Sequence, residues 1–162
     1  MSADPLVTAD PESFLAAAGA GRLAGLDIGT KTIGLATGSA DGAFATARDT
    51  LRRTRPAADM EALAAFARHE GIVGFVVGLP LSMDGSDSTR TQSVRAQARN
   101  IARASGLPVL LWDERWSTAA VERAMIDADI SRARRAERID ALAAAHILEG
   151  ALARLVRLRR PF

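Results

Sequence analysis

Cysteine is absent from the 162 residues of this chain, which excludes disulfides, thiolate metal sites and a cysteine nucleophile. A metal ion could be held only by oxygen ligands or by the histidines, His69 and His146. No stretch is apolar for long enough to span a bilayer. Residues 1–10 contain acids and Pro5 instead of the cationic and apolar regions of a secretory signal. These absences predict a soluble, cytoplasmic protein with no membrane partner.

Lysine is almost absent, since Lys31 is the only one in the sequence. The remaining basic residues are arginines, and the pI is near 10.3 although the formal net charge is only +2. The planar guanidinium group of arginine makes forked contacts to phosphate. A general bias toward alanine and arginine would produce the same count, so composition alone leaves phosphate binding open.

The length and the hydrophobic pattern predict a single α/β domain. Three strands followed by alternating helices and strands favour a three-layer sandwich around a mixed five-stranded sheet. We expect a flexible N-terminal leader over residues 1–20, with a short helix starting at Asp10–Pro11, one domain over 21–158, and a basic C-terminal tail over 159–162. The predicted strands are 23–28, 32–37, 44–51, 72–77 and 109–112, and the predicted helices are 57–69, 91–104, 117–128 and 137–157.

Asp27 lies within the apolar stretch 23–28, which is typical of a buried strand. A charge inside a strand is unfavourable unless something pairs with it. A metal ion would do so, which makes Asp27 a candidate ligand. The alternative is a buried carboxylate that bonds the following turn, Gly29–Thr30.

Two further acidic segments are candidates for the same site. Asp113 and Glu114 follow the predicted strand 109–112, and because strand side chains alternate, only one of them can face Asp27. For Asp113 an ion pair with Arg115 is the simpler interpretation. Asp140 opens an apolar helix whose alanines would let it lie close to the sheet. Its alternative role is a partner of the helix dipole.

Convergence of three carboxylates from distant segments has a chemical reason. Mg²⁺ prefers hard oxygen ligands, and a pair of such ions roughly 3.5–4 Å apart can activate water and stabilise the leaving oxygen of a phosphodiester. Without a cation between them, one of the three carboxylates would be driven to protonate. The acids Asp27, Glu114 and Asp140 therefore predict metal-dependent hydrolysis.

Four motifs in order give the chain a family resemblance. They are Gly25–Lys31 (GLDIGTK), Val77–Gly85 (VGLPLSMDG), Asp113–Thr118 (DERWST) and Ile139–Ala144 (IDALAA). Together they resemble the YqgF/RuvX family of Holliday-junction-resolvase-like proteins, which are also described as pre-16S rRNA nucleases. The first motif alone is also similar to the phosphate loop of actin-like ATPases, but those proteins need a second lobe and a second such loop, and neither is found in this sequence.

The resemblance implies an RNase H-like nuclease domain, dependence on Mg²⁺ or Mn²⁺, and Asp27, Glu114 and Asp140 as catalytic residues and metal ligands. Thr32 stands where the family usually has Arg, and Ser82 where it usually has Asn; both departures concern substrate contact and leave the acids in place. Phosphate contacts are expected from Lys31, Arg115 and the basic stretch with Arg132, Arg134, Arg135 and Arg138, taken as a loop that orders on nucleic acid.

The expected function is processing of the pre-16S rRNA 5′ end, resolution of Holliday junctions, or both. The sequence does not choose between structured RNA and branched DNA, because phosphate and metal chemistry is common to both. A junction resolvase needs two active sites, so a homodimer would favour DNA junctions. The alternatives are a nucleic-acid-binding module without catalysis and an actin-like nucleotide-binding fragment.

Overall fold

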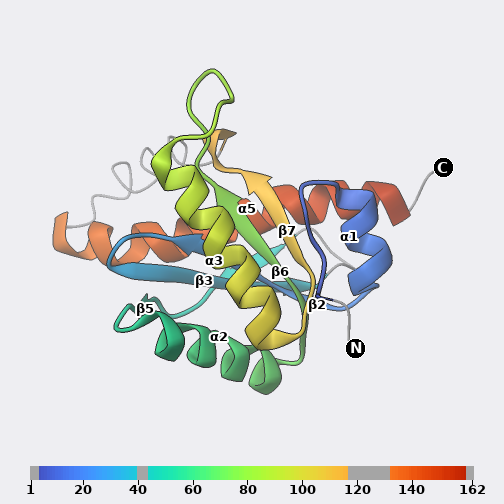
Figure 1. The fold of residues 1–162 in the computed structure, drawn as a ribbon, viewed down its shortest axis with the longest axis horizontal. Coiled ribbons are helices and arrows are strands. Elements are labelled where there is room, and N and C mark those ends of the chain that lie inside the picture. Colours follow the sequence, from blue (N-terminus) through green and yellow to red (C-terminus); the bar gives the residue numbers. More distant parts are fainter. Residues whose placement is uncertain (1–3, 40–43, 117–131, 160–162) are drawn as a thin grey trace.

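The computed structural model describes residues 4–39, 44–116 and 132–159 as one mixed sheet between two layers of helices (Figure 1). The strand order is β1-β7-β6-β2-β3-β4, and β5 pairs with β3 beside this path. The pair β2–β3 is an antiparallel hairpin, whereas β2, β6, β7 and β1 run parallel. The strands are β1 (Val7–Thr8), β2 (Arg22–Ile28), β3 (Thr32–Ser39), β4 (Ala45–Ala47), β5 (Leu51–Arg52), β6 (Ile72–Leu79) and β7 (Val109–Asp113).

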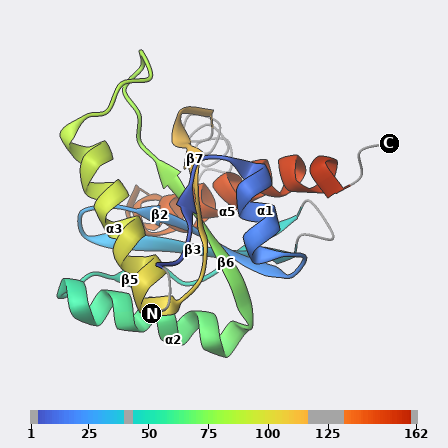
Figure 2. The same cartoon turned by 45° about the vertical axis from the view of Figure 1, so that its right-hand side comes forward.

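Helices cover both faces of the sheet, as the two views show (Figures 1 and 2). One face carries α2 (Pro56–Glu70) and α3 (Thr89–Ser105), and the other carries α1 (Pro11–Ala18) and the long α5 (Arg132–Arg159). A 3-10 turn, η1 (Glu114–Trp116), follows β7 directly. Among the described helices, none combines the length and apolar character needed to cross a membrane.

The helix boundaries follow from ordinary capping chemistry. Asp10 accepts hydrogen bonds from the first backbone N–H groups of α1, as its position before Pro11 predicts. Helices α2 and α3 end at Gly71 and Gly106, whose φ angles of 67° and 72° lie in the left-handed region that favours glycine. Local sequence therefore determines where these helices start and stop.

Two hydrophobic cores lie on opposite faces of the sheet, which confirms the three-layer arrangement. The first joins alternate residues of β2 and β6, such as Leu26 and Phe75, to α2 and α3. The second joins Leu23 and Val76 to α5 and to Phe14 of α1. Each central strand thus contributes to both cores, because successive side chains point to opposite faces.

The structure corrects the prediction of a five-stranded sheet, since seven strands are described. The expected strand 44–51 is two short strands, β4 and β5, that both pair with β3. The other added strand is β1, in the segment expected to be a flexible leader. It pairs with β7, and Phe14 of the following helix is only 1% exposed. Residues 7–18 therefore belong to the folded domain.

The basic stretch expected as a loop before Asp140 is also different in the structure. Residues 132–138 form the first two turns of α5, which the sequence predicted to begin at residue 137. Arginine and alanine are both good helix formers, so their intrinsic preference favours extension of the helix through this stretch. The predicted helix 117–128 and residues 160–162 of the expected basic tail lie outside the described residues.

Candidate active site

Asp27 occupies the centre of the site, near the end of β2. Gly34 of β3 is its register partner, and Gly78 of β6 follows Val77, the partner of Leu26. The two glycines flank Asp27 on the face that α5 covers. Asp27 is 8% exposed, and its Oδ1 atom has no hydrogen-bond partner among the residues that the structure describes. The alternative interpretation, a carboxylate satisfied by the following turn, does not account for this unpaired oxygen.

Glu114 and Asp113 point to opposite faces of the sheet, as alternation predicts. A Cβ atom placed on Gly78 would lie 3.4 Å from Oε2 of Glu114, which puts Glu114 on the Asp27 side. Asp113 instead accepts hydrogen bonds from Arg115, including one of 2.5 Å from Nη2 to Oδ2. The simpler interpretation of Asp113 as an ion-pair partner is confirmed.

Asp140 reaches the site because α5 lies directly on the glycines of the sheet. A Cβ on Gly34 would overlap the backbone of Asp140, and one on Gly25 would lie 2.7 Å from the carbonyl oxygen of Ala144. Thr32, at the start of β3, donates a hydrogen bond from Oγ1 to Oδ2 of Asp140. Thr32, one of the two positions at which the sequence departs from the pattern of the family it resembles, is thus a direct partner of one acid.

The three acids influence one another's charge. Burial, followed by the negative charges of Glu114 and Asp140, raises the pKa of Asp27 from 3.8 to about 7. Burial also raises the pKa of Glu114, and the charges of Asp113 and Asp140 add to this effect. Carboxylates in such a setting bind a proton or a cation at neutral pH.

The donor set fits a hard divalent cation, because it consists of carboxylate oxygens and includes the unpaired Oδ1 of Asp27. Among the described residues, however, no three acidic or histidine side chains are gathered into a ready ligand set. The carboxylates are therefore near enough to perturb one another but do not surround a single point. A bound cation would have to draw them together.

Arg90, which the sequence analysis did not single out, is a basic residue whose charge acts on this site. Its positive charge lowers the pKa of both Asp27 and Glu114. The exposed side chain stands on the first turn of α3. The one feature of the sequence that could have indicated Arg90 is its position just after the loop between β6 and α3. The motif Val77–Gly85, which contributes to the family resemblance, includes part of this loop.

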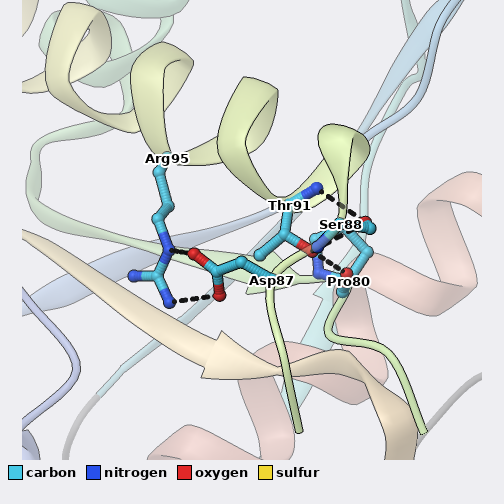
Figure 3. Close-up of polar contacts among 5 residues, drawn as sticks. All are labelled: Pro80, Asp87, Ser88, Thr91 and Arg95. Carbon is cyan, nitrogen blue, oxygen red and sulfur yellow. Dashed lines mark hydrogen bonds and ion pairs between the residues drawn. The ribbon is translucent and has the colours of Figure 1, made fainter.

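The first turn of α3 is held firmly against the end of β6 (Figure 3). Ser88 and Thr91 form a reciprocal capping box, and Thr91 Oγ1 also donates a 2.5 Å hydrogen bond to the carbonyl of Pro80. Arg95 makes a two-pronged ion pair with Asp87 at 2.9 and 3.1 Å. The backbone that carries Arg90 is therefore fixed relative to the strand beside Asp27.

The residues predicted to bind nucleic acid have mixed surroundings. Lys31 is exposed on the β2–β3 turn. Arg115 is held by Asp113 and by a 3.1 Å hydrogen bond from its Nη1 to the carbonyl of Met83, so it ties the loop 79–88 to η1. The arginines of the basic stretch lie on α5, where only the backbone is described: Arg132, Arg134, Arg135 and Arg138.

Comparison with known families identifies the chain. The RuvX family, described as "Holliday junction resolvase", matches residues 21–154, a span that contains all three acids. The chain belongs to the RuvX family. This assignment leaves the actin-like fragment without support, because the match covers the sheet, the loop 79–88 and α5 together.

Two relatives of this RuvX-family chain share more than half of their aligned residues with it. Proteins named "Putative pre-16S rRNA nuclease" from Sphingopyxis alaskensis and Zymomonas mobilis are 61% and 57% identical to it. The alignments cover 94% and 82% of this chain and 99% and 80% of the relatives. The expected fold is confirmed by similarity to a structure of T. thermophilus RuvC in complex with a Holliday junction substrate, with a TM-score of 0.52, 18% identity, and coverage of 83% of this chain and 96% of that one.

Proposed function

We propose that this RuvX-family nuclease hydrolyses phosphodiester bonds with Mg²⁺ or Mn²⁺ held by Asp27, Glu114 and Asp140. The observation that carries the proposal is Asp27, a buried carboxylate with an unpaired oxygen and a pKa raised to about 7 beside two further acids. Such an arrangement is costly for folding unless a cation uses it. The relatives' name and the family's description both concern nucleic acid.

The chain's own residues divide the remaining work. Asp27, Glu114 and Asp140 hold the cation, which when bound would activate water and stabilise the leaving oxygen. Thr32 restrains Asp140 through its hydroxyl group. Arg90 and Lys31 attract the phosphate of the strand toward the acids, and their contacts supply affinity without sequence preference.

The proposed substrates are the two that the relatives and the family name: structured RNA at the 5′ end of pre-16S rRNA, and branched DNA. Close identity over nearly full length favours the RNA substrate, with a cytoplasmic location. Branched DNA would add the requirement for two active sites, hence a homodimer. Arg115 and the arginines of the basic stretch remain proposed contacts to either substrate.

The decisive measurement is cleavage of labelled pre-16S rRNA 5′ ends and four-way DNA junctions with Mg²⁺, Mn²⁺ or EDTA. Asp27→Asn should lower the cleavage rate at least about a hundredfold while retaining binding, because it removes charge from the cation site and leaves the phosphate contacts. Asp49→Asn, an exposed acid of the same type elsewhere, is the control. A wild-type protein that binds but never cuts would instead make the chain a binding module.

A further inference from the structure

A second concave site lies close to the acids. A pocket of about 550 Å³ opens between the β2–β3 turn, β5 and the first halves of α2 and α3. This volume suits a ligand of nucleotide size. Most of its lining residues carry polar groups, among them Lys31, Arg52, Arg53, Asp59, Ser93 and Gln97.

The pocket carries excess positive charge. Asp59, its only acid, is 3% exposed and already engaged: it accepts a 3.0 Å hydrogen bond from the backbone N–H of Thr54 and pairs with Arg53 at 3.5 Å. Lys31 and Arg52 are exposed, and their side chains make no hydrogen bond or ion pair with the described residues. Two uncompensated cations at one pocket favour an anionic ligand, above all phosphate.

Hydrogen bonds within the protein already fix part of the pocket wall. Arg53 Nη1 donates a 2.7 Å hydrogen bond to the carbonyl of Gly29, and its backbone N–H donates a 2.9 Å bond to the carbonyl of Lys31. Gln97, another lining residue, donates a long hydrogen bond of 3.3 Å to Ser93, and its Oε1 atom is buried with no partner in the described part of the chain. Rotation of this amide toward a ligand donor would satisfy an oxygen that has no partner in the free protein.

The pocket and the acids lie on two sides of one turn. Asp27 precedes the turn, Thr30 and Lys31 line the pocket, and Thr32 bonds Asp140. Lys31 is four positions along the chain from Asp27, so their Cα atoms are at most about 14 Å apart. Figure 1 shows the turn at the end of the sheet where β5 and the start of α2 lie. A strand with one phosphate at the acids reaches the pocket by crossing this turn.

We propose that this pocket binds one nucleotide of the substrate strand, a few nucleotides from the phosphate that is cut. The phosphate of this bound nucleotide, not the one that is cut, lies between Lys31 and Arg52. A sugar hydroxyl or a base amine of the same nucleotide donates a hydrogen bond to the amide oxygen of Gln97. This inference rests on the proposed nuclease function and extends it: the enzyme grips its substrate at a second point. Single-stranded nucleic acid is flexible enough to bend around the turn.

Equilibrium binding of fluorescently labelled single-stranded RNA and DNA of one sequence, measured in EDTA with the full chain, tests the pocket. Arg52→Gln should weaken binding about fivefold to tenfold, and Arg52→Lys should restore most of it, because the lost contact is mainly a charge. Gln97→Leu should weaken it about threefold. The controls Arg103→Gln and Gln92→Leu change the same residue types elsewhere on α3 and should bind like wild type.

The outcomes separate this inference from the proposed function, since no cleavage is measured. A Gln97 effect confined to RNA identifies the 2′-hydroxyl as the donor, and an effect on both strands identifies the base; either supports the pocket. Folded Arg52→Gln and Gln97→Leu proteins, verified by circular dichroism, that bind both strands like wild type overturn it. The inference is also overturned if adenosine monophosphate binds the protein tightly and, at saturating concentration, leaves the binding of the labelled strands unchanged. In the separate cleavage assay, absence of cleavage by wild type would overturn the nuclease proposal, whereas the strand-binding measurements would still decide whether the pocket binds a nucleotide.

Discussion

At the scale of single residues, Asp27 combines a cost to folding with a use in binding. Its pKa of about 7 in the folded chain, against 3.8 ordinarily, means that the folded state keeps a proton that the unfolded state releases between these pH values. In the metal-free protein, this carboxyl therefore lowers stability as pH rises from about 4 to about 7. Above that range both states are ionised, and the loss of stability stays at its full size.

The first prediction concerns Asp27→Asn. Without metal, the variant should be more stable than wild type above about pH 7, by at most about 4 kcal/mol, and the difference should disappear near pH 4. Urea unfolding in EDTA at several pH values measures it. Asp113→Asn gives the opposite sign, because Arg115 lowers the pKa of Asp113 and its charge stabilises the fold at high pH. Equal pH dependence in Asp27→Asn and wild type would refute the buried charge cluster.

The second prediction concerns Arg90, whose charge offsets those of Asp27 and Glu114. Arg90→Gln should move the acidic limb of the cleavage pH profile upward by a few tenths of a pH unit at low salt, since the carboxylates lose a compensating cation. High salt should remove the difference, because the side chain is exposed and screening is strong. Arg90→Lys should restore the profile. An unchanged profile at low salt would show that Arg90 has no role at the acids.

At the scale of elements, the site depends on how closely α5 lies on the sheet. Gly25, Gly34 and Gly78 have no Cβ on the face that α5 covers. The backbone of α5 fills the space at Gly25 and Gly34, and the side chain of Ile147 fills it at Gly78. This close contact brings the backbone of Asp140 against β3, beside Asp27. The position of Asp140, a proposed catalytic acid, thus depends on residues without side chains.

The third prediction is that Gly34→Ala will damage both stability and activity. The added methyl group would overlap the backbone of Asp140, so α5 must move away. Overpacking of this kind costs about 1–3 kcal/mol. Thermal unfolding and cleavage assays on the same preparation measure the two effects. Full activity in a stable Gly34→Ala protein would show that close approach of α5 is not required.

The fourth prediction concerns α1, which the sequence placed in a flexible leader. Phe14 is buried against α5 and would meet any side chain introduced at Gly74. Phe14→Ala should lower the free energy of unfolding by about 3–5 kcal/mol, because it leaves a cavity in the second core. Leu6→Ala, at an exposed position of the same segment, should have little effect. Denaturant titration of the two variants distinguishes a structural α1 from a loose leader.

At the scale of the whole molecule, a modest net charge of +2 hides an uneven distribution. Lys31, Arg52 and Arg90 gather around the end of the sheet that holds the acids. The acids repel phosphate, so these cations and the bound metal must dominate the local field for a nucleic acid to approach. Binding should therefore depend on salt more strongly than the net charge suggests.

The fifth prediction gives that dependence a size. If three cations contact phosphates of a single strand, an about fourfold rise in salt should weaken binding in EDTA about twentyfold. Anisotropy titrations at a series of salt concentrations provide the slope. Arg52→Gln should reduce the slope of log binding constant against log salt by nearly the share of one phosphate contact, whereas Arg103→Gln should leave the slope unchanged. A slope near zero would contradict phosphate binding at this end of the sheet.

Much of this molecule follows from local sequence, because local forces suffice for it. Alternation and apolar runs locate the hairpin and the central strands, and capping residues such as Asp10 and Gly71 locate helix ends. The three acids were visible as charges in apolar surroundings. The opposite orientation of Asp113 and Glu114 followed from the pleat of a strand.

Only the tertiary structure decided the features that depend on contacts between distant segments. The edge strand β1 is too short to be recognised without its partner β7, and the sequence of residues 132–138 shows no apolar face to mark them as helix. Arg90 gains importance because the first turn of α3 is fixed beside β6, and the pocket exists only where the turn, β5, α2 and α3 meet. The sequence determines which charged and polar side chains are available, whereas packing determines which of them lie close enough to interact.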